Sequence, residues 1–421
     1  MHSASRRSLK VLATTLAATI ALAIPAAASA APRPAVPKPA EACAKNAAPP
    51  APVDTSEKPA PGQASPSPLP VPAQPVGGAR MGECGTVVPA DVLNPPDGVT
   101  AASWVLQDLD TGNVLAAKDP HVRERPASLI KTLLALVAVT ELKPEQPITV
   151  TKEDAEQECT CVGIEAGEQY TVDQLLHGLL MHSGNDVAHA LATALGGVDA
   201  TLAKMNGLAA RIGATDTRAA TPSGLDGPGM STSAYDLSLI FHYAMKQPEF
   251  AKAVATKQYE LPGSNGKPAI PILNDNKLLG VYPGFLGGKT GFTDDARHTY
   301  VGAAQRDGKR VAIVLVRAEQ QPTPVVSQAS KLLDYGFALE KVKADPVGKI
   351  DYQAPAAATT EEKSGKAGGT NVANAAAGGG AAAEDAFGTT GWVITVLVFL
   401  IIAGGFAVGY QRKKAQAEQD R

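Results

Sequence analysis

Three short segments of this 421-residue chain carry side chains that could do chemistry together. They are SLIK (residues 128–131), SGN (residues 183–185) and KTG (residues 289–291). A serine hydroxyl needs a neighbouring base before it can attack a carbonyl carbon. Lys131 lies one helical turn after Ser128, on the same face, and can take the hydroxyl proton if it is neutral. The residue types therefore predict nucleophilic catalysis by serine.

The glycine pair before Lys289 also resembles a loop that binds phosphate, but its spacing excludes that function. A phosphate loop requires Gly, four residues, then Gly-Lys-Ser/Thr, with a helix directly after it. Pro283 stands where the first glycine is required, and the residues after Thr290 lead into β-branched runs. We therefore expect no nucleotide site.

The first two segments are expected at the ends of helices. Pro126 precedes a long apolar run with helical spacing, which puts Ser128 at the start of a helix. Residues 171–195 contain two helical runs that are interrupted at residues 183–185. This pattern predicts a short loop, carrying a hydroxyl and an amide, between two packed helices.

The third segment is expected on a strand. Residues 298–305 and 310–317 are rich in β-branched residues and flank an Asp307-Gly308 turn, which is a hairpin signal. Residues 103–119 alternate around a turn at residues 110–113 and predict another hairpin. Lys289 leads a strand that precedes the first of these hairpins in the sequence.

The two ends of the chain predict secretion and anchoring. Residues 1–30 combine a basic head, an apolar stretch and a small-residue cleavage site, as a signal peptide does. Residues 391–411 form an almost uninterrupted apolar run whose uncharged part spans about 28 Å as a helix, enough to cross a bilayer. The basic residues of the tail, 412–421, mark the cytoplasmic side. The body of the protein should therefore face the outside of a cell.

Two tracts of low complexity separate these ends from one domain. Residues 31–91 are rich in Pro and Ala and predict a disordered spacer, and residues 342–390 are rich in Ala and Gly and predict a flexible tether. The remaining residues, 92–341, are enough for one domain with a substantial core. The net charge is −3, so the chain lacks the excess of positive charge that is typical of proteins that bind nucleic acid.

The chain has four cysteines, at positions 43, 84, 159 and 161. Outside a cell they tend to be oxidised, and four cysteines allow three pairings, which the sequence leaves open. A bond between Cys159 and Cys161 would be strained because the two are so close. No histidine lies at metal-finger spacing, so we expect neither a metal nor another cofactor.

In this order, Ser-x-x-Lys, Ser-x-Asn and Lys-Thr-Gly form the trio of penicillin-binding proteins and class A β-lactamases. The chain resembles the low-molecular-weight D-alanyl-D-alanine carboxypeptidases over residues 92–341. The resemblance extends to residues 221–240 and 328–340, and ECTCVG (residues 158–163) is similar to the actinobacterial branch. It implies an α/β penicillin-binding transpeptidase/β-lactamase-like fold, with an antiparallel sheet of about five strands, flanking helices and a mostly helical insert that carries Ser183.

The resemblance also implies a role for each residue of the trio. Ser128 would form an acyl-enzyme with peptidoglycan stem peptides, or with β-lactams as covalent inhibitors. Lys131 would be its base, and Ser183 would relay a proton to the leaving D-alanine. Asn185 would hold the substrate amide or orient Lys131. Lys289 would bind the peptide carboxylate and, as a nearby cation, depress the pKa of Lys131.

The strand that begins at Lys289 would pair with the substrate as an added strand. Thr290, Gly291 and Phe292 belong to it, and the Phe292 N–H together with the Ser128 N–H would form the oxyanion hole. Many relatives carry an arginine near the start of the closing helix that binds the terminal carboxylate. Val325 stands there in this chain, which leaves Arg317 or Thr290 for that role. The β-rich C-terminal domain of many relatives is also missing.

Three other functions compete with this one. A class A β-lactamase needs a glutamate after the Ser-x-Asn loop, and no glutamate occurs between Glu168 and Glu249. A receptor without activity would have lost Ser128 or Lys131, and both are present. A zinc peptidase would carry His-Glu-x-x-His, which is absent from the sequence.

Overall fold

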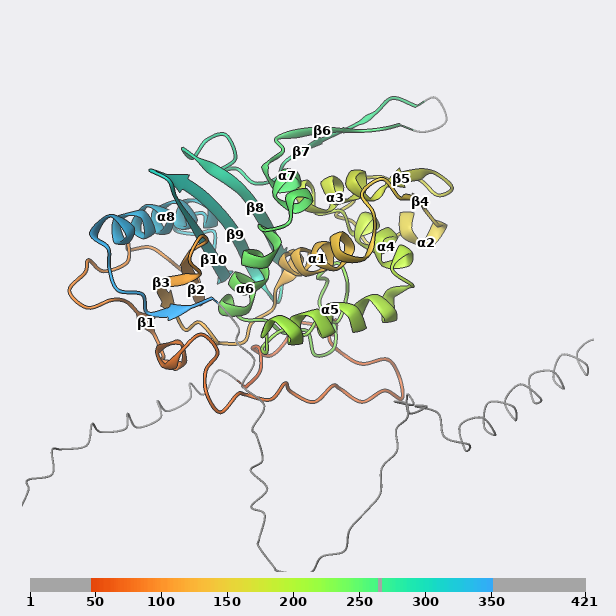
Figure 1. Ribbon diagram of the computed structural model, residues 1–421. Coiled ribbons are helices and arrows are strands. Elements are labelled where there is room, and N and C mark those ends of the chain that lie inside the picture. Colours follow the sequence, from red (N-terminus) through yellow and green to blue (C-terminus); the bar gives the residue numbers. More distant parts are fainter. Residues whose placement is uncertain (1–46, 264–266, 351–421) are drawn as a thin grey trace, which may run out of the picture. The chain divides into compact units, whose positions relative to one another are not determined.

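A computed structural model describes residues 47–263 and 267–350 of the chain, and its centre is an antiparallel seven-stranded sheet (Figure 1). The strand order is β1-β3-β2-β10-β9-β8, with β11 beside β3. Five strands are long, in agreement with the sheet of about five strands that the resemblance implied, and two more have only two residues each. The strands are β1 (Thr86–Val87), β2 (Ser103–Asp108), β3 (Asn113–Lys118), β8 (Phe285–Thr293), β9 (Arg297–Arg306), β10 (Lys309–Ala318) and β11 (Gly348–Lys349).

Both predicted hairpins are confirmed. β2 pairs with β3, and β9 pairs with β10 across the turn at Asp307 and Gly308. These two turn residues have φ angles of 52° and 78°. A two-residue turn with positive φ at both positions twists in the same sense as the strands it joins, which explains why Asp-Gly stands there.

Helices cover both faces of the sheet, and alternation along the strands decides which residues meet them. α8 (Val325–Val342) packs on one face and α6 (Ala234–Ala244) on the other. Leu106 of β2 belongs to the apolar cluster under α8, whereas its neighbour Val105 belongs to the cluster shared with α6. Adjacent residues of a strand point to opposite faces, so both are fully buried.

The helical insert lies between β3 and β8 in sequence (Figure 1). Its α3 is fixed by a capping box, in which Thr171 accepts from the Gln174 N–H and the Gln174 side chain accepts from the Thr171 N–H. Two small two-stranded sheets, β4–β5 and β6–β7, are attached to it. The elements are α1 (Lys131–Glu141), α2 (Lys152–Ala155), α3 (Val172–Met181), α4 (Asn185–Ala194), α5 (Val198–Ile212), α7 (Pro248–Ala255), β4 (Pro147–Thr149), β5 (Gln169–Thr171), β6 (Gln258–Leu261) and β7 (Ile270–Leu273).

The packed part of the chain extends beyond residues 92–341 at both ends, which differs from the predicted spacer and tether. Before residue 92, Met81 is fully buried and β1 pairs with β3. After residue 341, β11 pairs with β3, and Ile350 is buried. These contacts use few residues in a Pro/Ala-rich or Gly-rich context, so composition does not reveal them.

Arg123 binds the described part of the Pro/Ala-rich segment to the domain. Its buried guanidinium donates to the carbonyl oxygens of Ala47, Leu69 and Pro70, and to the carboxylate of Asp216. A proline-rich backbone has few N–H donors but keeps all its carbonyl acceptors, so an arginine fork suits it.

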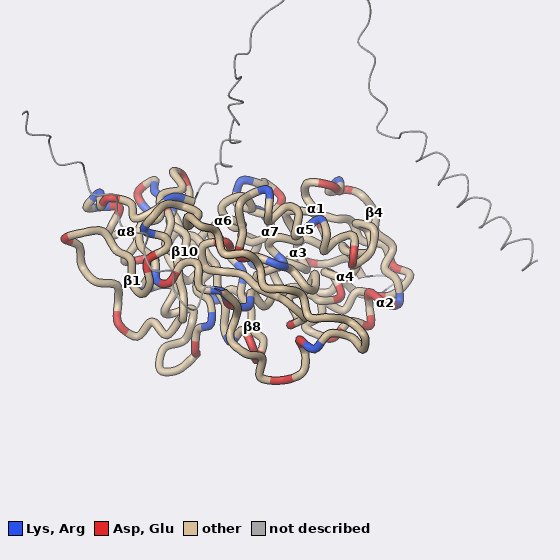
Figure 2. Tube along the Cα trace, turned by 90° about the horizontal axis from the view of Figure 1, so that it is seen from below, with Lys and Arg blue, Asp and Glu red and all other residues tan. Residues whose placement is uncertain are grey.

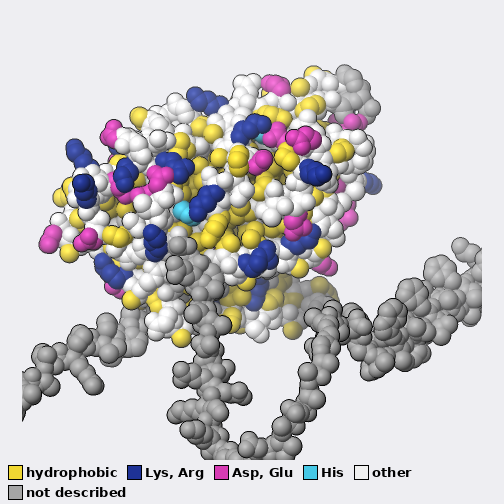
Figure 3. Space-filling view, viewed as in Figure 1, with side chains coloured by type: hydrophobic (Ala, Val, Ile, Leu, Met, Phe, Trp, Pro, Cys, Tyr) yellow, Lys and Arg dark blue, Asp and Glu magenta, His cyan; other side chains and the backbone are white. Residues whose placement is uncertain are grey.

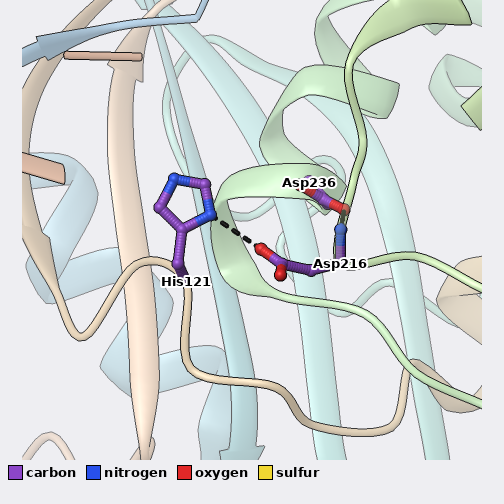
Figure 4. A group of neighbouring side chains, drawn as sticks. All are labelled: His121, Asp216 and Asp236. Atoms are coloured by element: carbon purple, nitrogen blue, oxygen red, sulfur yellow. Dashed lines mark hydrogen bonds and ion pairs between the residues drawn. The ribbon is translucent and has the colours of Figure 1, made fainter. Parts of the chain in front are cut away.

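A buried network of His121, Asp216 and Asp236 continues this attachment (Figure 4). His121 Nδ1 lies 2.7 Å from Asp216 Oδ2, and His121 Nε2 lies 2.9 Å from the Val76 carbonyl oxygen. The Asp216 carboxylate helps to raise the pKa of His121 against the effect of burial, and burial raises the pKa of Asp236 to about 8. The ligating atoms of the three side chains are close enough to share an ion, but Arg123 and His121 already bind the Asp216 carboxylate.

Acidic and basic residues are interspersed along the chain (Figure 2), and both kinds are scattered over the face in Figure 3. Among the helices of residues 47–263 and 267–350, none is long and apolar enough to cross a membrane. The predicted signal peptide, residues 1–30, and the predicted membrane helix, residues 391–411, lie outside the described residues.

Candidate active site

Ser128 and Lys131 lie where the helical insert meets the sheet. Ser128 belongs to a 3-10 turn, Ala127–Ile130, that runs directly into α1. Lys131 Nζ lies 3.0 Å from Ser128 Oγ, within hydrogen-bond distance. Ala127 holds a φ angle of 46°, which a residue with a side chain rarely adopts. The chain therefore enters the turn in a strained conformation immediately before the hydroxyl.

The Ser-x-Asn segment forms the predicted loop between α3 and α4. Ser183 is buried and has a φ angle of 64°, and Asn185 is the first residue of α4. Asn185 Oδ1 accepts a hydrogen bond of 2.7 Å from Lys131 Nζ. The structure thus brings the first two segments into direct contact through Lys131 and Asn185.

The Lys-Thr-Gly segment lies on a strand, as predicted, but in the middle of β8 and not at its start. Lys289 is fully buried, and its Nζ donates to the Thr290 carbonyl oxygen at 2.6 Å. A methyl group on Gly291 would lie 2.9 Å from the backbone nitrogen of Ser128 and 2.5 Å from Thr299 Oγ1. Only glycine lets β8 approach the serine turn this closely.

Burial lowers the pKa of both lysines, and a like charge adds to the shift of Lys131. Desolvation, followed by the nearby Lys289 ammonium, holds the pKa of Lys131 well below its usual value, while Asp186 opposes the shift. Desolvation lowers the pKa of Lys289 to about 8, and Asp275 opposes that shift. At neutral pH Lys289 is therefore mostly charged, whereas the shift at Lys131 favours the neutral amine that a base requires.

One group at the site, the Ser223 carbonyl oxygen, was not predicted from the sequence. It accepts a hydrogen bond from Lys131 Nζ. The approach requires Gly224, where a methyl group would lie 2.1 Å from the Ala127 carbonyl oxygen. A main-chain acceptor has no residue-type signal, but the Ser-Gly pair within residues 221–240 marks the turn that presents it.

The remaining predicted residues lie around this centre. Phe292 follows Gly291 on β8 and pairs with His298 of β9, with about half of its surface exposed. Val325, at the position of the missing arginine, is buried at the start of α8. Arg317 donates to the Asp295 carbonyl oxygen at 3.1 Å and lies 3.8 Å from Glu124. The Arg317 guanidinium therefore already has partners near the end of β8.

Cys159 and Cys161 form a disulfide, with their Cα atoms 4.7 Å apart. That Cα separation lies within the usual range for disulfides, and the bond is one of the pairings that the sequence left open. Cys84 is also disulfide-bonded. The loop that carries Cys159 and Cys161 touches Asn185 directly.

Comparison with known proteins agrees with this geometry. A family model described as D-alanyl-D-alanine carboxypeptidase matches residues 90–320. The D-alanyl-D-alanine carboxypeptidase DacB2 of Mycobacterium tuberculosis is 49% identical over 258 residues, which cover 60% of this chain and 87% of that protein. The D-alanyl-D-alanine carboxypeptidase DacF of Bacillus subtilis is 31% identical over 243 residues, covering 56% of this chain and 62% of that protein.

Solved structures show the same likeness. A D-alanyl-D-alanine carboxypeptidase from M. tuberculosis is 45% identical with a TM-score of 0.59, covering 63% of this chain and all of that one. A mutant of the Streptomyces K15 DD-transpeptidase is 29% identical with a TM-score of 0.55, covering 58% of this chain and all of that one. The family match spans more than half of the chain and includes all three motifs, so the chain belongs to the D-alanyl-D-alanine carboxypeptidase family.

Proposed function

We propose that this protein is a serine-type D-alanyl-D-alanine carboxypeptidase that removes the terminal D-alanine from peptidoglycan stem peptides. The observation that carries the proposal is the hydrogen bonding of Lys131. Its Nζ has three neighbours: Ser128 Oγ, Asn185 Oδ1 and the Ser223 carbonyl oxygen. Two of these oxygens can only accept. A neutral amine has two N–H donors and one lone pair, so it satisfies both oxygens and turns its lone pair to the hydroxyl.

The first half of the reaction forms an ester. Ser128 Oγ attacks the carbonyl carbon of the penultimate D-alanine while its proton moves to Lys131 Nζ. The bond from that carbon to the nitrogen of the last D-alanine then breaks. Ser183, in the loop beside Lys131, relays the proton to the leaving amine. Water hydrolyses the ester by the reverse proton route and restores both groups.

Two features of β8 support binding of the substrate at this site. The close approach that Gly291 permits puts the Ser128 N–H beside the strand, where it and the Phe292 N–H can bind the oxyanion. Lys289, with a pKa of about 8, is mostly charged at neutral pH and suits the terminal carboxylate, with Thr290 beside it. A β-lactam presents an amide and a carboxylate in the same arrangement, so it acylates Ser128 as well.

We further propose that the protein is anchored in the cell membrane with this domain outside. The composition of residues 1–30, 391–411 and 412–421 supports a signal peptide, one membrane helix and a short cytoplasmic tail. Residues 92–341 carry the three motifs. We assign residues 31–91 and 342–390 to the connections, except for the parts that pack on the domain through β1 and β11. Truncation before Trp392 tests the anchor: we expect secreted, active protein in the medium. Secreted but inactive protein would contradict these boundaries.

Penicillin labelling tests the catalytic assignment. We expect intact mass spectrometry to show one adduct after treatment with a fluorescent penicillin, and peptide mapping to place it on Ser128. Ser128→Ala should abolish the adduct, whereas Ser65→Ala, at an exposed serine of the N-terminal segment, should leave it unchanged. An adduct that persists in Ser128→Ala refutes the assignment.

A further inference from the structure

The loop of residues 158–164 carries the Cys159–Cys161 disulfide and holds the main chain and side chain of Asn185. The Asn185 N–H donates to the Thr160 carbonyl oxygen at 2.7 Å. The Asn185 side-chain Nδ2 donates to the Glu158 carbonyl oxygen, also at 2.7 Å. One of these carbonyls precedes the bonded cysteines and the other lies between them. The disulfide therefore constrains the short stretch of backbone whose carbonyl oxygens bind Asn185.

The next residue of α4 fixes the other end of the same loop. The buried Asp186 carboxylate accepts from the main-chain N–H groups of Val162, Gly163 and Ile164, at 3.1, 2.7 and 3.2 Å. The Val162 side chain packs so closely on the Ser-x-Asn turn that a methyl group on Gly184 would lie 2.9 Å from it. With its far end held, the loop has little freedom except near the cysteines.

The contact at Glu158 decides which atom of the Asn185 amide faces the catalytic lysine. A carbonyl oxygen only accepts, so the Asn185 group beside it must be the NH₂. The Asn185 oxygen is then turned to Lys131 Nζ, 2.7 Å away. If the amide rotated, its NH₂ would face Lys131 and could no longer accept from it.

We propose that the disulfide-closed loop is a positioning element for catalysis, which holds the Asn185 amide in the orientation that Lys131 requires. The inference rests on the proposed role of Lys131 as the base. Reduction of the disulfide frees the peptide units of Glu158 and Thr160, and Asn185 loses its fixed orientation. The loop thereby acts through Asn185 and touches no reacting atom.

Two effects on penicillin acylation follow. The rate on the pH plateau should fall about tenfold, because Lys131 Nζ is no longer held toward Ser128. The acid limb of the rate profile should move to lower pH by about one unit. An acceptor stabilises the charged lysine, so its loss lowers the pKa of Lys131 by an amount typical of one hydrogen bond to a charged group.

The experiment compares oxidised and reduced forms of one protein. It uses the full chain with Cys43→Ser and Cys84→Ser, so that only the Cys159–Cys161 pair can change. Cys159 is exposed and Cys161 half-buried, which leaves the bond open to tris(carboxyethyl)phosphine. The phosphine and one water become the phosphine oxide, and the disulfide takes up the two electrons of the phosphine and the two protons of the water to give two thiols. Acylation rates are measured from pH 5 to pH 9, and mass spectrometry counts the acylated fraction, so that unfolded molecules do not enter the rate.

Thr160→Ala is the matched control, because it changes the side chain between the cysteines but keeps the disulfide and both carbonyls. Thr160→Ala should retain the plateau rate and the position of the acid limb of the oxidised protein. The double variant Cys159→Ser/Cys161→Ser should have the plateau rate and acid limb of the reduced protein. A lower rate with an unmoved limb would overturn the proposal, since general loosening of the fold gives that result. Normal acylation of Ser128 with no effect of reduction would overturn it too, while leaving the proposed function intact. Failure of the oxidised form to acylate at Ser128 would instead contradict the proposed function.

Discussion

Replacement of Lys289 by glutamine should move the pH dependence of acylation in a direction that the structure fixes. The Lys289 ammonium is the second cause, after desolvation, of the depressed pKa of Lys131. Removal of that charge raises the pKa of Lys131, so a higher pH is needed to make the base neutral and the acid limb moves up. Lys131 remains fully buried in the variant, so desolvation, the larger cause of its depressed pKa, persists. We therefore expect a shift of about one pH unit, equivalent to about 1.4 kcal/mol.

The assay is the rate of acylation by penicillin at saturating concentration, so that weaker capture of its carboxylate does not enter. Lys289 has a pKa of about 8, and the comparison is made from pH 5 to pH 7, where the unmodified protein carries that charge. On the acid limb the rate follows the neutral fraction of Lys131, so the variant should react about tenfold more slowly at a given pH. Lys289→Arg keeps the charge and should keep the limb. A limb that stays in place, or moves down, in Lys289→Gln would refute the coupling between the two lysines.

Two further predictions concern close packing and attachment. Gly291→Ala should slow acylation about 100-fold, because a methyl group 2.9 Å from the Ser128 nitrogen must displace the strand or the serine turn, and the rate measured on folded protein checks this. Arg123→Met should lower the free energy of unfolding by about 3–5 kcal/mol in urea denaturation, because it leaves the buried Asp216 without its guanidinium partner. The same change at Arg80, in an exposed pair with Glu83, should cost less than about 1 kcal/mol, and equal costs would contradict the role given to Arg123.

The elements that carry the three motifs could be predicted because each has a local signal. Pro126 and the spacing of apolar residues predict the helix after Ser128, and the Asp307-Gly308 turn predicts the hairpin beside β8. Their order along the chain matched a known trio, which supplied the fold. Distances could not be predicted in the same way. The approach of Gly291 to the Ser128 nitrogen depends on segments more than 150 residues apart.

Other parts of the structure could not be predicted because main-chain atoms make the contacts. Carbonyl oxygens of Ala47, Leu69 and Pro70 bind Arg123, and any residue type offers such an oxygen. Composition therefore indicated a disordered spacer, while a buried arginine elsewhere in the chain holds its described part. The hydrogen bond from Lys131 to the Ser223 carbonyl oxygen could not be predicted for the same reason.

Under the proposed function, the two buried lysines also explain why the site suits an anionic substrate. The hydrogen bonds of Lys131 Nζ and Lys289 Nζ go to hydroxyl and carbonyl oxygens, so neither contact supplies a full negative charge. Burying an ammonium group without a counter-charge is costly, and both pKa values fall as a result. A carboxylate that enters beside Lys289 supplies the missing charge there. The depressed pKa of Lys131 favours the neutral form, which its proposed role as the base requires. Binding energy from the carboxylate and reactivity at Ser128 thus depend on the same imbalance of charge.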